Sequence, residues 1–327
     1  MKFMEKIDLW LKIGRAYTLP QSAIPYIFAV ILASKQCRID VFLSILGLLG
    51  VVLVHLSVNM LDDYFDWKKG AVAEYKKLLN LGLQASTHKC FYLEQNLITL
   101  NQLLVVSLAF DAIACIIGLY IATKAGISVI IIAILAGFMG FFYSAPPLSL
   151  SYKGLGEPVI GIIFGPLLMA GAYITAGAVI DKPILFASAM LGLLIANIAF
   201  THAIMDFNSD VEVRKTSFAT LFRTKERAIK ALATVYIIAY LILAAGIVLK
   251  VYPLASAIVF ITVPKTFALI KLMSSETREK KFWMGAIENW ENCKKEGSDW
   301  FMLRLCLSRN ILLDFILLLG LTYYLFG

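Results

Sequence analysis

A group of oxygen-bearing side chains stands at the end of a long apolar stretch, in residues 59–70. Its members are Asn59, Asp62, Asp63 and Asp66. A helix turns by about 100° per residue, so all four side chains fall within an arc of roughly 100°. Three carboxylates on one face repel one another unless a cation neutralises them, and hard oxygen ligands favour magnesium or calcium over zinc. We expect all four to bind Mg2+, with Asp63 and Asp66 as catalytic residues; a solvated helix end is the alternative.

A second acidic face follows at the end of another apolar stretch, in residues 202–215. Asp206 and Asp210 are one helical turn apart. His202 stands one turn before them and Arg214 one turn after them. We expect the two aspartates to be catalytic metal ligands. His202, Arg214 and Lys215 are expected to line a substrate pocket, where the two basic residues suit an anionic ligand.

The stretch 142–158 contains several prolines and glycines, which predicts a rigid, non-helical loop. Lys153 in this loop is expected to be a catalytic residue that contacts phosphate oxygens, with Tyr143 and Ser144 as hydroxyl donors. Lys69, which follows the first acidic group, is expected to line the same pocket. The alternative is a plain connecting loop whose lysine serves only membrane topology.

The elements that hold these residues are expected to cross a membrane. Of the 327 residues, 60% are hydrophobic and 16% are charged, which is more apolar length than one soluble core uses. A membrane span takes about 20 apolar residues. Stretches of this kind lie at approximately 17–34, 41–61, 97–122, 127–145, 158–179, 184–205, 231–249, 251–270 and 310–326. We therefore expect an all-α polytopic membrane protein with nine transmembrane helices.

Lysine and arginine are distributed unevenly between the segments that join these spans. Five lie on one side, one lies within a span, and the remaining 24 of the 30 lie on the side of the N-terminus. The side that is richer in these residues is the cytoplasmic one. We expect the N-terminus to be inside a prokaryotic cell and the active site to open toward the cytoplasm.

Both acidic faces end the second helix of a set of four spans, so both are expected on the same side of the membrane. Two parallel halves, about 17–152 and 153–272, are therefore expected within a single membrane domain of residues 1–327. Residues 1–16 fit an interfacial amphipathic helix, 273–309 an interfacial connection and 310–327 the last helix. Two cation sites on one side imply a polyanion that bridges them, and diphosphate is the expected ligand.

The net charge of +8 favours membrane lipid headgroups and an anionic substrate as partners. Nucleic acid is not expected, because the basic residues stand between apolar runs rather than on a solvated face. Asp111 and Lys265 lie inside expected spans, where an unpaired charge costs at least ~2.5 kcal/mol. We expect Asp111 to face protein and to be protonated or bonded to a neighbouring helix. Lys265 either has such a partner, Asp111 being one candidate, or extends toward the headgroups.

Together these features resemble the UbiA superfamily of intramembrane prenyltransferases, most closely its MenA-like branch, the 1,4-dihydroxy-2-naphthoate polyprenyltransferases. That branch carries an N-x-x-N-D-Y-x-D-x-x-K-G pattern. Residues 59–70 match the pattern in register, except that Asp62 replaces the second Asn. The loop stretches 143–148 and 152–157 are also similar to the family, as is 164–167.

The resemblance implies magnesium-dependent transfer of a prenyl group from a polyprenyl diphosphate to a hydrophobic or aromatic acceptor, in menaquinone or related lipid biosynthesis. The second motif of the family reads N-N-x-R-D-x-x-x-D-x-x-x-G-K-x-T. Here His202, Ala203 and Met205 replace the two Asn and the Arg, and Arg214 and Ser217 replace the Gly and the Thr. Three alternatives therefore stay open: an intramembrane terpene cyclase, a prenyltransferase of a non-aromatic lipid acceptor and, outside the enzymes, a transporter.

Overall fold

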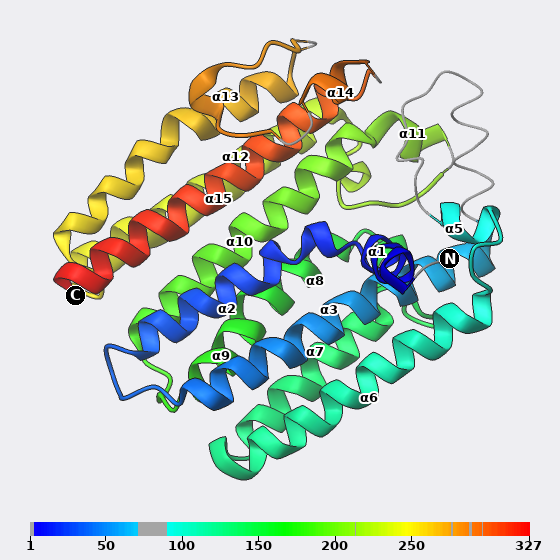
Figure 1. Cartoon of the computed structure of the whole chain (residues 1–327). Coiled ribbons are helices and arrows are strands. Elements are labelled where there is room, and N and C mark those ends of the chain that lie inside the picture. The colour runs from blue at the N-terminus through cyan, green and yellow to red at the C-terminus, as the bar shows by residue number, and fades with distance from the viewer. Residues whose placement is uncertain (1–2, 71–89, 213, 276, 288–289, 296) are drawn as a thin grey trace. The chain divides into compact units, whose positions relative to one another are not determined.

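The computed structural model describes residues 3–70, 90–212, 214–275, 277–287, 290–295 and 297–327, and Figure 1 traces the chain. Its elements are helices; the extended pairing among these residues is a single bridge between Lys153 and Thr216. The apolar composition of the chain thus forms helices, in which every backbone polar group can be satisfied within one segment.

Long apolar helices dominate the described part of the chain. Eight of them are long and apolar enough to cross a membrane: Ala16–Ala33 (η1 and α2), Val41–Lys69 (α3), Leu100–Ala125 (α6), Gly156–Thr175 (α8, η3 and α9), Lys182–Met205 (α10), Lys225–Val248 (α12), Leu254–Met273 (η5 and α13) and Asp299–Phe326 (α15). A shorter apolar helix, α7, covers Ser128–Ser144 and has 17 residues, which is the lower limit for a span. The protein is an integral membrane protein, and a ninth span formed by α7 stays a prediction.

Local sequence signals set the ends of the helix that carries the first acidic group. The Asp40 side chain accepts a hydrogen bond from the Leu43 amide at 2.9 Å and so caps the start of α3. At the other end, Gly70 has a φ of 75°, a left-handed conformation that glycine adopts without steric cost. The acidic residues therefore lie in the last turns of a helix that ends at Lys69.

The chain forms two compact units. Unit 1 comprises Met1–Tyr152 and Leu167–Ile180, and unit 2 comprises Lys153–Pro166 and Asp181–Gly327. The two parallel halves expected from the sequence stay a prediction.

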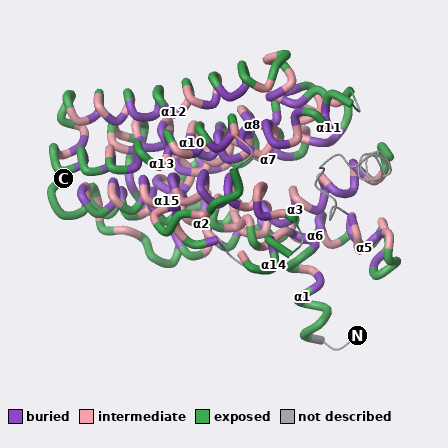
Figure 2. Tube along the Cα trace, turned by 90° about the horizontal axis from the view of Figure 1, so that it is seen from above, coloured by how far each residue is buried: buried purple, intermediate pink, exposed green. Residues whose placement is uncertain are grey.

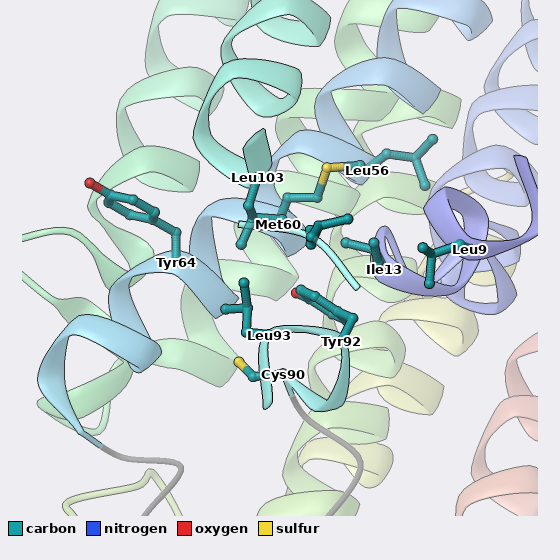
Figure 3. Close-up of a cluster of buried hydrophobic side chains, with 10 residues drawn as sticks. Leu9, Ile13, Leu56, Met60, Tyr64, Cys90, Tyr92, Leu93 and Leu103 are labelled. Atoms are coloured by element: carbon teal, nitrogen blue, oxygen red, sulfur yellow. The ribbon is translucent and has the colours of Figure 1, made fainter. Parts of the chain in front are cut away.

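In unit 1, a buried cluster joins the N-terminal helix α1 (Phe3–Ile13) to α3, to α6 and to the short helix α5 (Phe91–Glu94). Figure 3 shows Leu9 and Ile13 on the side of α1 that faces Leu56 and Met60 of α3. The approach is also close at Gly14, where a Cβ would lie 2.9 Å from a Leu56 methyl carbon. This packing carries the chain after α1 toward the acidic end of α3.

In unit 2, α10 is the most buried of the candidate spans, as Figure 2 shows by the run of buried residues along it. It packs against α8 (Gly156–Ile162), α12 and α15. Glycines permit the contact with α8 and with the following π-helical turn Ile163–Leu167: a Cβ on Gly192 would lie 2.7 Å from the Gly161 carbonyl oxygen. The helix that ends at the second acidic face is thus held close to the start of α8.

The last helix begins earlier than the sequence predicts. Its expected range was 310–327, whereas α15 starts at Asp299 and includes Arg304. The charged residues near its start lower the hydropathy of this segment, but the helix continues through them. The Arg304 guanidinium is satisfied by hydrogen bonds to the carbonyl oxygens of Leu272 and Ser275, at 2.8 and 2.6 Å, around the end of α13. The expected connection 273–309 accordingly contains a short helix, Trp290–Lys295 (α14), and the first turns of α15.

The two charges inside spans have polar neighbours. Asp111 on α6 lies within hydrogen-bonding reach of Ser57 on α3, in agreement with the expectation that it faces a neighbouring helix. Lys265 donates to Asp314 of α15 at 2.6 Å, so its partner is on the last helix rather than being Asp111. The sequence did not identify Asp314 as the partner because helix adjacency is decided by packing.

Candidate active site

Asp63 is enclosed at the end of α3. Its side chain is 2% exposed; one carboxylate oxygen accepts from the Arg15 guanidinium and the other from the Tyr92 hydroxyl at 2.6 Å. Burial disfavours the charged guanidinium, but the carboxylates of Asp63 and Asp62 outweigh it and raise the pKa of Arg15. Burial and the Asp63 charge raise the pKa of Tyr92, which therefore stays a hydrogen-bond donor.

The backbone geometry of Arg15 is unusual for the residue that approaches these carboxylates. Its φ is 54° and its ψ is 47°, the left-handed conformation, which costs a non-glycine residue about 1–2 kcal/mol. In this conformation Arg15 forms ion pairs with both Asp62 and Asp63. Neither Arg15 nor Tyr92 was singled out from the sequence, because each lies far from Asp63 along the chain, Arg15 in the turn after α1 and Tyr92 in α5.

The other members of the first group have different partners. The Asn59 amide donates to the Gly14 carbonyl oxygen at 2.9 Å and to Thr18 Oγ1 at 3.3 Å. Asp62 accepts from the Ser144 hydroxyl and lies 3.4 Å from the Arg15 guanidinium. Asp66, which is buried, accepts from the hydroxyl of Tyr152. The structure thus brings the loop residue Ser144 to the acidic group, as expected, and adds Tyr152.

Lys69 joins the end of α3 to the loop that follows α7. Its Nζ donates to the Ser144 carbonyl oxygen at 2.9 Å and to Ser149 Oγ at 3.0 Å, and lies 3.9 Å from the centre of the Tyr152 ring. The loop is not helical between Ser144 and the single turn Leu150–Tyr152, as the prolines and glycines predict. Lys69, Ser144 and Tyr152 are therefore one connected group within unit 1.

The second acidic face belongs to unit 2. Helix α10 ends at Met205, and Asp206 links it to α11 (Phe207–Glu212). The Asp210 amide donates to the Asp206 carbonyl oxygen at 2.9 Å, so the two aspartates keep the one-turn spacing that the sequence predicts. His202 Nε2 lies 3.2 Å from Asp206 Oδ2, one turn earlier.

The basic residues after this face differ from the expectation in one respect. The helix ends at Glu212, and Arg214 is exposed with a φ of 54°, so it does not continue the acidic face by one more turn. Lys215 takes that place: its Nζ is 3.6 Å from Asp210 Oδ1. Asp210 is 1% exposed, and burial raises its pKa while Lys215 opposes the shift.

Lys153 and Glu157 lie in the same unit as this face. Lys153 is exposed, and its backbone pairs with Thr216, the residue after Lys215. Glu157, in the first turn of α8, is 9% exposed and lies within electrostatic range of Lys215 and Asp210. Glu157 stands in the predicted loop but was not singled out, because burial is not visible in a loop sequence.

The oxygen ligands of both faces suit a hard divalent cation. Among the described residues, no three His, Cys, Asp or Glu side chains come together as a metal-binding group. Magnesium fits this arrangement, since it commonly takes one or two carboxylates and completes its shell with water and substrate phosphate. Asp210 Oδ1 is buried and makes no hydrogen bond in the described part of the chain, and its charged neighbour is the Lys215 ammonium at 3.6 Å. This oxygen could serve as a magnesium ligand.

The sequence between residues 22 and 289 matches the model of the UbiA prenyltransferase family. The chain belongs to the UbiA prenyltransferase family. It is therefore an enzyme of the prenyltransferase class. The match covers both acidic faces and the loop, so the resemblance seen in these motifs is confirmed.

Individual UbiA relatives are distant in sequence. The chain is 22% identical over 268 residues to the 1,4-dihydroxy-2-naphthoate octaprenyltransferase of Bacillus subtilis, covering 80% of this chain and 81% of that one. It is 30% identical over 134 residues to the 2-carboxy-1,4-naphthoquinone phytyltransferase of Synechocystis, covering 41% and 43%.

Solved structures share the UbiA fold. A structure from work on digeranylgeranylglyceryl phosphate synthase aligns with this chain with a TM-score of 0.65 at 16% identity. The alignment covers 98% of this chain and 99% of that chain. A UbiA homologue from Archaeoglobus fulgidus, bound to GPP and Mg2+, gives 0.62 at 15% identity, covering 93% and 99%. At these identities the similarity establishes the fold alone.

The second motif of the UbiA family accounts for the positive φ of Arg214. This residue occupies the position where the second motif of the family has glycine, and it is held at positive φ. Glycine enters that region without steric cost, whereas arginine is strained there. The substitution thus changes the residue but keeps the turn.

Proposed function

We propose that the protein transfers a prenyl group from a polyprenyl diphosphate to an aromatic acceptor of the naphthoate type, in a reaction that depends on magnesium. The observation that carries the proposal is the pair of acidic helix ends, each with a lysine beside it, in a chain of the UbiA family. The naphthoate prenyltransferases among the relatives support the choice of acceptor.

In unit 1, Asp62 and Asp66 would hold magnesium, with Asn59 and Asp63 as further oxygen ligands. The bound ion would neutralise the charge that develops on diphosphate as the allylic C–O bond breaks. Ser144 and Tyr152 orient the two carboxylates through their hydroxyl groups. Lys69 adds a positive charge beside them and fixes the loop.

In unit 2, Asp206 and Asp210 would hold a second ion. Lys215 and Lys153 would supply positive charge for phosphate oxygens. The backbone bridge between Lys153 and Thr216, the residue after Lys215, keeps the two lysines in neighbouring segments of the chain. His202 Nε2 lies 3.2 Å from Asp206 Oδ2 and could help to position this carboxylate. An apolar environment then protects the allylic cation from water until the acceptor attacks it.

The test combines purified protein, magnesium and prenyl diphosphates of several lengths with 1,4-dihydroxy-2-naphthoate or a glycerol-based lipid acceptor. We expect a product whose mass contains both the naphthoate ring and the prenyl chain. Chelation of the metal should abolish product formation, and added magnesium should restore it. A prenyl product that lacks an acceptor would contradict the proposal and indicate a cyclase, and a product formed only with the lipid acceptor would exclude the naphthoate.

Substitutions test the two faces separately. Asp66→Asn and Asp206→Asn should each lower turnover by about 100-fold or more, because each removes a charged ligand. Asp8→Asn is the matched control, since the Asp8 side chain is 63% exposed on α1 and pairs only with Lys12 in the described structure. More than about a tenth of the activity in both Asp66→Asn and Asp206→Asn would count against magnesium binding by these carboxylates.

A further inference from the structure

An ion pair in unit 2 joins two candidate membrane spans near the middle of each. Lys265 lies in the span Leu254–Met273 and Asp314 in the span Asp299–Phe326. A helix that crosses a hydrocarbon layer about 30 Å thick has its middle residues inside that layer. Figure 1 shows α13 and α15 side by side.

The pair is not sealed inside the protein. The Lys265 side chain is 23% exposed and that of Asp314 is 35% exposed. Beside them is a groove of about 350 Å³, lined by Ile261, Thr262, Lys265, Asp314, Leu317 and Leu318. Ile261 and Leu317 are each 67% exposed, so the groove opens on the outer surface of unit 2, where a membrane protein meets lipid. A molecule that enters it comes from the membrane.

The pair has hydrogen-bonding capacity that the protein leaves unused. In the described structure, the contact of Lys265 Nζ with Asp314 Oδ2 is the hydrogen bond that each side chain makes. An ammonium has three donors and a carboxylate about four acceptor positions, so further partners are needed in hydrocarbon. Thr262, the other polar residue of the groove, is already bonded to Tyr240 and to the Val259 carbonyl oxygen.

We propose that this groove binds a lipid-dissolved alcohol, with its hydroxyl group beside the Lys265–Asp314 contact, within reach of both charged groups, and its chain along the aliphatic wall. A hydroxyl group suits the pair because it accepts from the ammonium and donates to the carboxylate at once. The volume lies at the lower end of the range for small-molecule sites, which fits a single chain. The site belongs to unit 2 alone and does not depend on the proposed prenyl transfer.

Photolabelling in phosphatidylcholine nanodiscs tests the proposal. The probe is a hexadecanol that carries a diazirine on its chain, and the comparison probe is the same chain without the hydroxyl group. We expect the alcohol to label peptides that contain Ile261 or Leu317, and unlabelled hexadecanol to compete. The hydrocarbon should label these peptides at least about tenfold less, which corresponds to about 1.4 kcal/mol of binding free energy.

Two variants locate the site. The double variant Lys265→Met, Asp314→Leu removes both charges together and avoids leaving one unpaired, and it should lose about tenfold in labelling. Leu318→Trp fills the groove while keeping the ion pair, and should lose labelling to a similar extent. Leu325→Trp is its matched control, because Leu325 is 58% exposed on the same helix and does not line the groove.

Equal labelling by the alcohol and the hydrocarbon would overturn the proposal, as would labelling confined to other peptides. Wild-type labelling in Leu318→Trp would overturn it as well, and this variant decides the question if the double variant does not fold. In each of these cases the ion pair serves only to join α13 to α15.

Discussion

At the scale of single residues, the carboxylates at the end of α3 differ in their surroundings. Asp63 is 2% exposed and accepts hydrogen bonds from Arg15 and Tyr92. Asp62 is 13% exposed and accepts from Ser144 and, at 3.4 Å, from Arg15, and Asp66 accepts from the Tyr152 hydroxyl. A change at Asp63 therefore affects folding as well as chemistry. Asp66 is the better position for testing the metal.

Asp63→Asn should lower the free energy of unfolding by about 2 kcal/mol, because it leaves the Arg15 charge without its buried partner. Breaking a fully buried ion pair usually costs about 3–5 kcal/mol, and the cost is expected to be lower here because the Arg15 side chain is 24% exposed. Tyr92→Phe should cost about 1 kcal/mol by removing one hydrogen bond. In an Arg15→Met background, Asp63→Asn should cost clearly less. Unfolding in detergent micelles measures this cycle, and additivity within about 0.5 kcal/mol would exclude the coupling.

Lys153→Ala should raise the KM for prenyl diphosphate by about tenfold and leave the KM for the acceptor unchanged, because the lysine is expected to contact only the donor. The variant should remain folded, since the Lys153 side chain is exposed and its pairing with Thr216 uses the backbone. Lys182→Ala, another exposed lysine at the first residue of α10, is the control. An equal rise in both KM values would indicate a structural effect instead.

At the scale of elements, unit 2 depends on the close contact between α10 and the chain around the π-helical turn Ile163–Leu167. A Cβ on Gly165 would lie 2.6 Å from the Ser188 carbonyl oxygen and 2.8 Å from the Gly192 amide nitrogen. Both are backbone atoms, so a side chain cannot be accommodated by a rotamer change. Small residues permit such approaches between membrane helices.

Gly165→Ala should therefore lower the thermal midpoint in detergent, with a loss of about 1–3 kcal/mol in unfolding free energy. Gly137→Ala in α7 is the matched control, because nothing lies within 4 Å of the added Cβ. That control should be neutral or slightly stabilising, since alanine favours helices over glycine by about 1 kcal/mol. An equal response of the two variants would show that the packing at Gly165 tolerates a methyl group.

At the scale of the whole molecule, the orientation in the membrane stays a prediction from the charge distribution. Single cysteines at positions 35 and 250 should react with a membrane-impermeant maleimide added outside intact cells, in a background without the five natural cysteines. A cysteine at position 223 should react only after permeabilisation. All three replaced side chains are exposed, so lack of reaction would reflect the membrane side rather than burial. The reverse pattern would place the active site outside.

Local sequence features were enough to identify the class of the protein and to predict the chemistry of its site. Apolar length predicted the membrane helices, and the one-turn spacing of Asp206 and Asp210 predicted a shared face that the helix ends retain. The proline and glycine residues predicted the loop between α7 and α8. These features are local, because helix periodicity and backbone preference act over a few residues.

The tertiary structure decided the partners. Arg15 reaches Asp63 from the turn after α1, and Tyr92 reaches it from α5. Tyr152 reaches Asp66, and Lys265 pairs with Asp314 across 49 positions in the chain. It also placed Lys215 beside Asp210 in the position expected for Arg214, because the helix ends at Glu212. Such contacts depend on which helices pack together and how they are rotated, and the hydrophobic pattern of a membrane helix leaves both choices open, since lipid and protein interior are equally apolar.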